Sequence, residues 1–371
     1  MRITGAVLER SAAVPPYADS RPFRVGELEL DGPATGELLV RIEAAGICHS
    51  DLSVVDGNRP RPLPMLLGHE AAGIVEAVGD GVTDAAPGDR VVMTFLPRCG
   101  HCDACGTDGR LPCTVGSAAN GSGTLVGGGI RLHRDGEAIH HHLGVSGFAT
   151  HAVVSRTSVV RVDDDVPPEI AALLGCAVLT GGGAVINSAR PAGGSRIVIV
   201  GLGGVGMAAL LVAVALGLEV IGVDALPDKL TLARSLGAAA AYLPAEALEL
   251  GVRAPAVIEA AGSARAFETA IALTDIGGTT VTVGLAAPDA RAAVSPLLLT
   301  AEARTIVGSY LGSAVPRRDI PRYVEMWRAG RLPLERLVSS RIRLDEIETA
   351  MDRLATGAEL RQIITFDAPA T

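Results

Sequence analysis

The sequence predicts a two-part protein of the α/β plus β class, with an antiparallel β part and a parallel sheet flanked by helices. At 371 residues the chain exceeds the usual size of a single hydrophobic core. Short β-type runs broken by Gly, Pro and Asp fill residues 1–150, and apolar strands alternate with helices from residue 197 to about 310. These two patterns of predicted secondary structure favour two domains of different architecture.

The first part contains four short runs typical of strands, and the chain then changes character near Pro167. The four runs are GELLVRIEAAG (36–46), AAGIVEAVGDGV (71–82), GDRVVMTFLP (88–97) and THAVVSRTSVVRV (150–162). Their length and spacing predict an irregular, mostly antiparallel sheet. Residues 167–187, PPEIAALLGCAVLTGGGAVIN, predict one helix that leads into a second.

A glycine-rich turn lies between a strand and a helix in the second part. The turn fits G-x-G-x-x-G, and the next strand, EVIGVD, ends in Asp224. The glycines let the backbone approach a pyrophosphate at the helix N-terminus, and the carboxylate accepts from ribose hydroxyls while repelling a 2′-phosphate. The pattern predicts an NAD site in a doubly wound parallel sheet; a turn with a capping aspartate and no ligand is the alternative. The turn residues are Gly201, Gly203, Gly204, Val205 and Gly206.

Further strands and helices complete the second part and the tail. AVIEAAG, TTVTVGLA and TIVGSYL are apolar enough for strands buried on both faces. Residues 319–330 and 345–357 predict amphipathic helices, and RQIITF (361–366) predicts a last strand. The charge-free run 197–218 is long enough to span a bilayer, but its glycines favour a short strand and a helix instead.

Four of the six cysteines lie in one loop with the spacing C-x2-C-x2-C-x7-C. A disulfide needs an oxidising compartment, and an iron–sulfur cluster is compatible with the spacing alone. Tetrahedral thiolate zinc fits best, and four ligands leave no open coordination position, so this zinc is predicted to be structural. The four residues are Cys99, Cys102, Cys105 and Cys113.

Cys48, Cys176 and His69 remain, and together they offer three ligands with a fourth position open. Taken singly, each is equally compatible with a buried small side chain or a hydrogen-bonded core histidine. Two cysteines and a histidine are also the known catalytic zinc ligands of alcohol dehydrogenase, so this assignment is a match to a known site.

With these motifs the chain resembles the zinc-dependent medium-chain alcohol dehydrogenases over nearly its whole length. The resemblance rests on GICHSDL, GHEAAG, the four-cysteine loop, GCAVLTG, GLGGVG with Asp224, and LRQIITF. The long segment after Cys113, with GEAIHHHLG, is similar to the animal-type and thiol-dependent formaldehyde dehydrogenase branches. The resemblance implies a GroES-like catalytic domain of residues 1–177 and 311–371, an inserted Rossmann NAD-binding domain of residues 178–310, two zinc ions per chain, and a homodimer or a tetramer.

The resemblance also implies roles for individual residues. Cys48, His69 and Cys176 hold the catalytic zinc, Asp51 orients His69, and Glu70 lies behind the metal. Ser50 takes the proton of the alcohol hydroxyl. The remaining cofactor contacts are His49 and Arg361 at the pyrophosphate, Thr180 at the nicotinamide, and Lys229 at the adenosine ribose. The alternative interpretation is that Lys229 and Arg361 are solvated surface charges without a cofactor role.

Several pocket positions depart from the family pattern. Ser53 replaces the histidine that often ends the proton relay, His142 replaces an aromatic residue, and Ala118 replaces a larger apolar one. Phe95 is retained, and Arg59 stands where an apolar residue is common at the pocket mouth. These differences predict a roomier, more polar pocket for bulky, aryl or allylic alcohols. Alternatives are a thiol–formaldehyde adduct as substrate, a catalytically silent zinc protein, and a third metal at residues 140–142.

Composition and charge limit the classes of binding partner to be expected. A net charge of -9 argues against nucleic acid and anionic membrane as partners, which leaves a small-molecule substrate. The first residues, MRITGAVLERSAAV, contain no apolar signal-peptide core, so we expect a reducing, cytoplasmic location.

Overall fold

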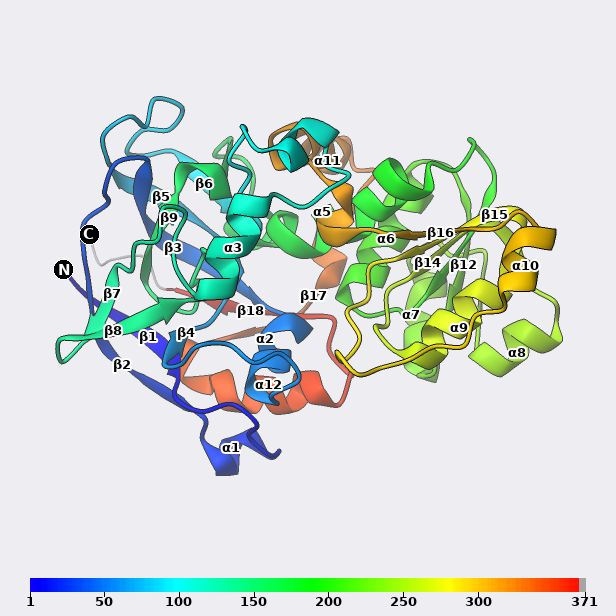
Figure 1. The fold of residues 1–371 in the computed structure, drawn as a ribbon, viewed down its shortest axis with the longest axis horizontal. Helices are drawn as coiled ribbons and strands as arrows, with labels where there is room; N and C mark the ends of the chain where they lie inside the picture. Colours follow the sequence, from blue (N-terminus) through cyan, green and yellow to red (C-terminus); the bar gives the residue numbers. More distant parts are fainter. Residues whose placement is uncertain (367–371) are drawn as a thin grey trace. The chain divides into compact units, whose positions relative to one another are not determined.

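The computed structural model describes residues 1–366, and its contacts divide the chain into two compact units (Figure 1). The β-rich unit comprises Met1–Thr107, Leu111–Cys176 and the chain from Val338, and the α/β unit comprises Asp108–Arg110 and Ala177–Leu337. The β-rich unit is therefore built from both ends of the chain. Residues 367–371 of the expected catalytic domain lie outside the described residues.

The β-rich unit contains a small closed barrel and a larger sheet. The barrel order is β1-β2-β7-β8-β4, and the sheet order is β10-β6-β5-β3-β18-β17, with β9 also paired to β3. The barrel strands are β1 (Arg2–Leu8), β2 (Phe23–Leu30), β4 (Met65–Leu66), β7 (Leu132–Arg134) and β8 (Glu137–His141). The sheet strands are β3 (Glu37–Ile47), β5 (Glu70–Val78), β6 (Arg90–Met93), β9 (His151–Ser155), β10 (Val159–Val162), β17 (Val338–Ile342) and β18 (Arg361–Thr365).

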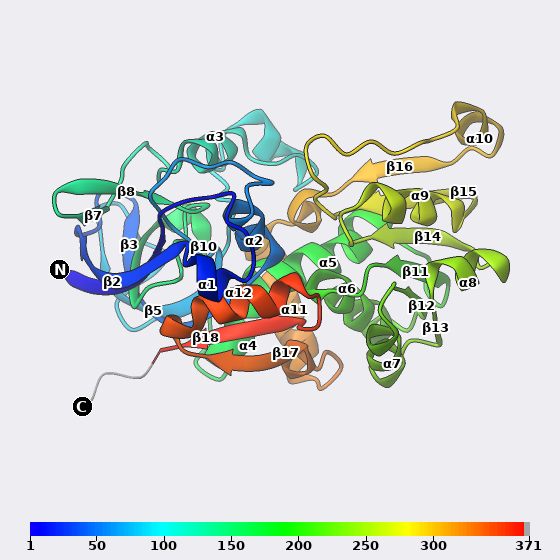
Figure 2. The same ribbon diagram turned by 90° about the horizontal axis from the view of Figure 1, so that it is seen from below.

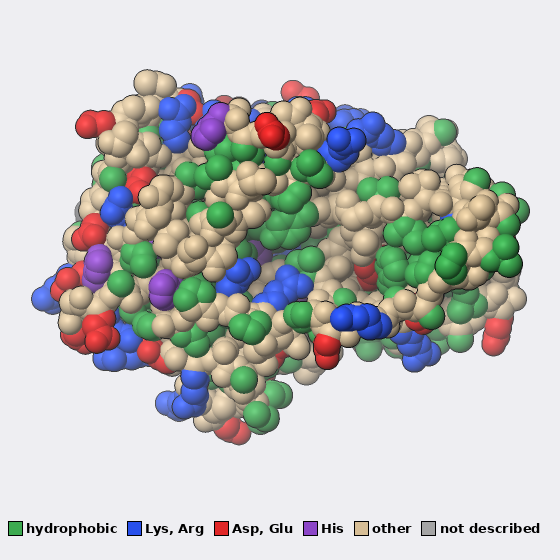
Figure 3. Space-filling view, in the orientation of Figure 1, with side chains coloured by type: hydrophobic (Ala, Val, Ile, Leu, Met, Phe, Trp, Pro, Cys, Tyr) green, Lys and Arg blue, Asp and Glu red, His purple; other side chains and the backbone are tan. Residues whose placement is uncertain are grey.

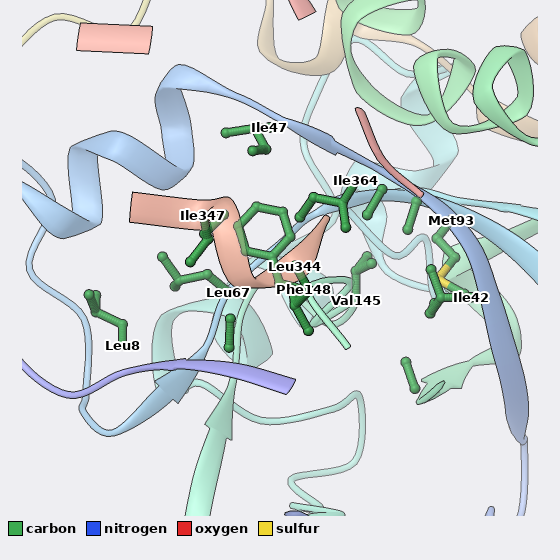
Figure 4. Close-up of a cluster of buried hydrophobic side chains, with 14 of the residues drawn as sticks. Leu8, Ile42, Ile47, Leu67, Met93, Val145, Phe148, Leu344, Ile347 and Ile364 are labelled. Carbon is green, nitrogen blue, oxygen red and sulfur yellow. The ribbon is translucent and has the colours of Figure 1, made fainter. Parts of the chain in front are cut away.

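A hydrophobic core joins these strands to the helix α12 (Ile347–Ala355) (Figure 4). Along β3, Leu38, Val40 and Ile42 alternate inward, as expected for a strand with one buried face. Ile347, Met351 and Leu354 recur at helical spacing, so one face of α12 is buried. In Figure 2 this helix lies beside α1 (Tyr17–Ser20), where the Asp352 carboxylate accepts from two backbone N–H groups.

The α/β unit is built on one parallel sheet with the order β13-β12-β11-β14-β15-β16. Its central strands are buried on both faces, since β11 and β12 each show four consecutive buried residues. The strands are β11 (Arg196–Val200), β12 (Glu219–Val223), β13 (Ala240–Tyr242), β14 (Ala254–Glu259), β15 (Thr274–Thr282) and β16 (Thr305–Gly308). The helices connecting them include α6 (Gly204–Ala215), α7 (Pro227–Ser235), α8 (Pro244–Glu249), α9 (Ala264–Ala272) and α10 (Pro296–Ala301).

The structure shows how two long apolar segments of the chain fold. The charge-free run 197–218 divides into β11 and α6, as predicted. Pro168–Ala189 is the stretch of the described chain that is long and apolar enough to cross a membrane, and 89% of its most apolar window is buried in the protein. That burial is typical of a core helix.

The units begin and end at residues that differ from the expected domain limits. Residues 311–337, expected with the catalytic domain, group with the α/β unit. The reason is packing: the helix α11 (Pro316–Arg328) carries the fully buried Tyr323, whose ring lies directly against Gly182 of α5 (Leu179–Gly183).

Candidate active site

The β-rich unit brings Cys48, His69 and Cys176 together from three segments. Cys48 precedes the helix α2 (His49–Val55), His69 precedes β5, and Cys176 lies in the π-helical turn Leu174–Val178. All three side chains are buried, their ligand atoms lie within 4.8 Å of one another, and Cys176 Sγ is 3.5 Å from His69 Nε2. Sulfur and nitrogen ligands of one tetrahedral zinc lie about 3.6 Å apart, so these residues fit a zinc ion.

The turn that carries Cys176 depends on a close backbone approach. A Cβ atom on Gly175 would lie 2.0 Å from the carbonyl oxygen of Met93 in β6. Glycine therefore lets the turn pack directly on the strand, and the neighbouring thiol reaches the cluster. A π-helical turn of this kind is frequent at functional sites.

Asp51 fixes the orientation of His69. Its Oδ1 lies 3.0 Å from His69 Nδ1 and accepts from the Gly68 N–H, and its Oδ2 accepts from the Cys48 N–H. Burial raises the pKa of this carboxyl, but the adjacent His69 and His142 rings hold the pKa below its ordinary value. An ionised Asp51 keeps the proton on His69 Nδ1 and leaves Nε2 free to bind a metal.

Glu70 and Arg361 form a buried pair beside the same ligands. Glu70 Oε1 is 3.5 Å from Arg361 Nε, and both side chains are at most 3% exposed. Burial raises the pKa of Glu70 to about 7, although Arg361 acts in the opposite direction. Both Glu70 oxygens and two Arg361 nitrogens lack hydrogen-bond partners among the described residues. Arg361 is therefore not a solvated surface charge. The unpartnered oxygens and nitrogens of the pair can form hydrogen bonds to a polar ligand.

The residues assigned to proton transfer lie at the start of α2. His49 is exposed, Ser50 is half-buried, and the Ser53 hydroxyl donates to the His49 carbonyl oxygen at 2.8 Å. Ser53 is thus bonded within its own helix.

The predicted pocket residues occupy different surroundings. The Phe95 and His142 rings both meet His69 edge-on, with centroids at 5.6 and 5.5 Å, and His142 Nδ1 lies 3.2 Å from Asp51 Oδ1. Arg59 is half-buried, and Ala118 is exposed on α3 (Thr114–Ser122). Of residues 140–142, only His142 joins a group of metal-ligating atoms, and it shares that group with Asp51 and His69.

The four-cysteine loop forms a separate cluster within the β-rich unit. The Sγ distances are 3.9 Å for Cys99–Cys105 and for Cys102–Cys113, and all four sulfurs lie within 4.8 Å of one another. Thiolates of one tetrahedral zinc lie about 3.8 Å apart, whereas a disulfide needs about 2 Å. Two backbone N–H groups, from Cys99 and Gly116, donate to Cys113 Sγ at 3.4 and 3.3 Å.

In the α/β unit, the glycine-rich turn lies between β11 and α6. A Cβ atom on Gly206 would be 1.8 Å from the Gly201 carbonyl oxygen, so this turn requires glycine. Asp224 follows β12, and its carboxylate accepts from the backbone N–H groups of Leu202 (2.6 Å) and Leu226 (2.9 Å). The carboxylate thereby ties the turn to the end of the neighbouring strand.

Two further predicted cofactor residues lie in the same unit. Thr180 is buried in α5, and Lys229 is buried in α7 with 5% exposure. Lys229 is therefore not a solvated surface charge.

The sequence did not indicate a role for Arg61 or Asn120, two polar residues that hydrogen bonds link to Phe95, whose ring contacts His69. Arg61 lies on the loop before β4, and its Nη1 donates to the Asn120 carbonyl oxygen of α3 at 3.3 Å. No motif marks either residue, because the segments that bring them together are far apart in the chain.

The sequence matches two family descriptions and several known proteins. Residues 34–164 match the alcohol dehydrogenase GroES-like domain, and residues 204–328 match the zinc-binding dehydrogenase family. A Mycobacterium tuberculosis protein named putative alcohol dehydrogenase D is 37% identical, with 98% of this chain and 100% of that protein covered. The NDMA-dependent alcohol dehydrogenase of Amycolatopsis methanolica is 35% identical, with 95% and 98% covered. The benzyl alcohol dehydrogenase structure from Acinetobacter calcoaceticus has a TM-score of 0.90 and 32% identity, and covers 99% of this chain and 100% of that one.

A GroES-like unit with a buried Cys–His–Cys cluster, joined to a dinucleotide-binding fold, defines a zinc-type alcohol oxidoreductase. The chain belongs to the zinc-dependent medium-chain alcohol dehydrogenase family.

Proposed function

We propose that the protein oxidises bulky, aryl or allylic alcohols to aldehydes or ketones, reversibly, with NAD as hydride acceptor. The observation that carries this proposal is the buried group of Cys48, His69 and Cys176, oriented by Asp51 in a chain that also contains the glycine-rich turn with Asp224. Zinc held by these ligands supplies Lewis acidity that makes an alcohol easier to deprotonate near neutral pH. The nicotinamide ring supplies the hydride acceptor.

The residues of the chain orient the reactants and move the proton. Asp51 fixes His69, so the three ligands keep one geometry through the reaction. Ser50, at the start of α2, accepts the hydroxyl proton and passes it onward. We assign pyrophosphate contacts to His49 and Arg361, the nicotinamide contact to Thr180, and the adenosine-ribose contact to Lys229.

NAD is proposed over NADP because of the charge of Asp224, which follows β12 and has no arginine in the next two positions. A carboxylate there disfavours a 2′-phosphate. The substrate class follows from the small Ala118 and the polar His142, and an aryl alcohol agrees with the name of the benzyl alcohol dehydrogenase neighbour.

A cytoplasmic homodimer is the proposed state of the enzyme. The edge strand β16 has β15 on one side and no strand on the other among the described residues. Ile276 and Leu297 are each 73% exposed in the same unit, and Figure 3 shows apolar side chains gathered around α9 and α10. An unpaired edge with exposed aliphatic residues favours pairing with a second copy, which sedimentation analysis would test.

The test is NADH formation by the zinc-loaded protein with a panel of benzyl, cinnamyl and aliphatic alcohols, repeated with NADP and in the reverse direction. We expect the highest kcat/KM for aryl or allylic alcohols with NAD. Turnover of formaldehyde only when a low-molecular-weight thiol is present would favour the thiol-dependent reaction instead. No turnover of any alcohol would favour the catalytically silent zinc protein.

A further inference from the structure

Arg61, in the loop that precedes β4, has no acidic partner among residues 1–366. Its Nη1 donates to a backbone oxygen, and its Nε is buried without a hydrogen-bond partner in the described part of the chain. The half-buried Arg90 and Arg131 are each held by a glutamate. Burying a charged donor without an acceptor is unfavourable, so a site with this feature gains when a ligand supplies the acceptor.

Short contacts connect Arg61 to the zinc ligands. Arg61 bonds to Asn120, the Asn120 Nδ2 donates to the Phe95 carbonyl oxygen at 2.7 Å, and the Phe95 ring meets His69 edge-on. Arg61 is therefore linked to His69 through Asn120 and Phe95.

The surroundings of Arg61 are packed and contain other unsatisfied polar atoms. A Cβ atom on Gly123 of the neighbouring turn would lie 2.9 Å from Pro62 and 3.1 Å from His140, so the loop, α3 and β8 fit closely. The Asn120 Oδ1 and His140 Nδ1 are also buried without partners among the described residues. This polar wall adjoins Phe95, which we place in the substrate pocket.

We propose that Arg61 is a specificity-determining residue that binds a carboxylate of the substrate, so that the preferred alcohols carry an anionic group away from the reacting carbon. This inference rests on the proposed function. A planar guanidinium matches a carboxylate with two parallel hydrogen bonds, and such charge-assisted bonds are stronger than neutral ones. The carboxylate is not altered in the reaction, so Arg61 contributes to substrate binding more than to the chemical step.

The experiment compares benzyl alcohol with the ortho, meta and para isomers of (hydroxymethyl)benzoate in the zinc-loaded protein. We expect Arg61→Gln to raise KM for the best carboxylate substrate by about tenfold or more, while kcat and both constants for benzyl alcohol stay within about twofold. Arg61→Lys should restore part of the loss, because it keeps the charge without the planar fork. Arg24→Gln, at an exposed position on β2, is the control, and Arg59→Gln tests the neighbouring guanidinium at the predicted pocket mouth.

Direct binding separates this inference from the proposed function. Calorimetric titration should show that the wild-type protein binds the carboxylate compound more tightly than benzyl alcohol and that Arg61→Gln removes the difference, whether or not turnover occurs. Equal losses for charged and uncharged compounds would mean that Arg61 only holds α3 in place, and would overturn the inference. A loss confined to Arg59→Gln would overturn it as well.

Discussion

The His141 ring accepts a hydrogen bond at Nε2 from the backbone N–H of Arg131, 3.0 Å away, inside the β-rich unit. Its Nδ1 lies 3.3 Å from the Ser146 hydroxyl, and the side chain is 1% exposed. Burial, followed by the nearby charge of Arg131, lowers the pKa of His141 to about 3. The folded protein therefore holds this ring neutral over a pH range in which the unfolded chain protonates it.

We predict that His141 makes the protein sensitive to acid. The unfolded pKa is about 6.5, so the stabilisation is complete above that value and is lost as pH falls toward about 3. Between about pH 7 and 5, the free energy of unfolding should fall by about 2 kcal/mol more in the wild type than in His141→Asn. Urea unfolding at several pH values measures this, with His133→Asn on the neighbouring strand as control. Parallel curves for wild type and His141→Asn would contradict the prediction.

Ser53→His should restore a proton acceptor at the end of α2. A histidine there titrates near ~6.5, whereas the present hydroxyl donates to the His49 carbonyl oxygen. If proton release limits turnover, kcat should rise severalfold at about pH 6–7 and little at about pH 9. The measurement is kcat against pH, with a deuterated alcohol to show whether hydride transfer is limiting. Identical profiles, with proton release limiting, would point to another base, and His49 would be the next residue to change.

Asp224→Gly should relax the discrimination against NADP. The change removes the charge that repels a 2′-phosphate, and it also removes two acceptors for the backbone of the glycine-rich turn. We therefore expect a higher KM for NAD together with a kcat/KM ratio closer to one for the two cofactors. Asp224→Asn removes the charge and one of the two acceptors, so it should relax the ratio with a loss of NAD affinity smaller than that of Asp224→Gly. An unchanged ratio in both variants would refute the role of Asp224.

Metal analysis should find two zinc ions per chain at separate sites. Cys48→Ala should retain about one zinc, remain folded and lose turnover, because it removes a ligand of the three-residue group. Cys102→Ala should lower the melting temperature, because a four-thiolate zinc contributes directly to folding. Loss of both ions from either variant would contradict independent sites.

The two groups of candidate zinc ligands and the glycine-rich turn could be predicted from the sequence. Local spacing indicated the four-cysteine loop and the turn, and resemblance to the family indicated Cys48, His69 and Cys176. The strands of the parallel sheet could also be predicted from the sequence, since burial on both faces gives continuous apolar runs such as residues 197–200. The barrel strands β4 and β7 could not be predicted, because two or three residues are too few for a periodic pattern.

Side-chain relationships across segments were beyond prediction from spacing. The burial of Arg361 against Glu70 and the approach of His142 to Asp51 depend on how three or more segments pack. The grouping of residues 311–337 with the α/β unit likewise depends on where Tyr323 packs.

The pairing of β18 with β3 determines which parts of the chain can finish folding during synthesis. β3 is made early, but its residues Ala44–Ile47 pair with β18, so this part of the β3 edge stays open until β18 has been made. The parallel sheet between them is complete well before then and can fold while the ribosome is still adding residues. A chain truncated before β17 would retain every zinc ligand and still expose an unpaired strand edge, which makes such fragments prone to aggregate.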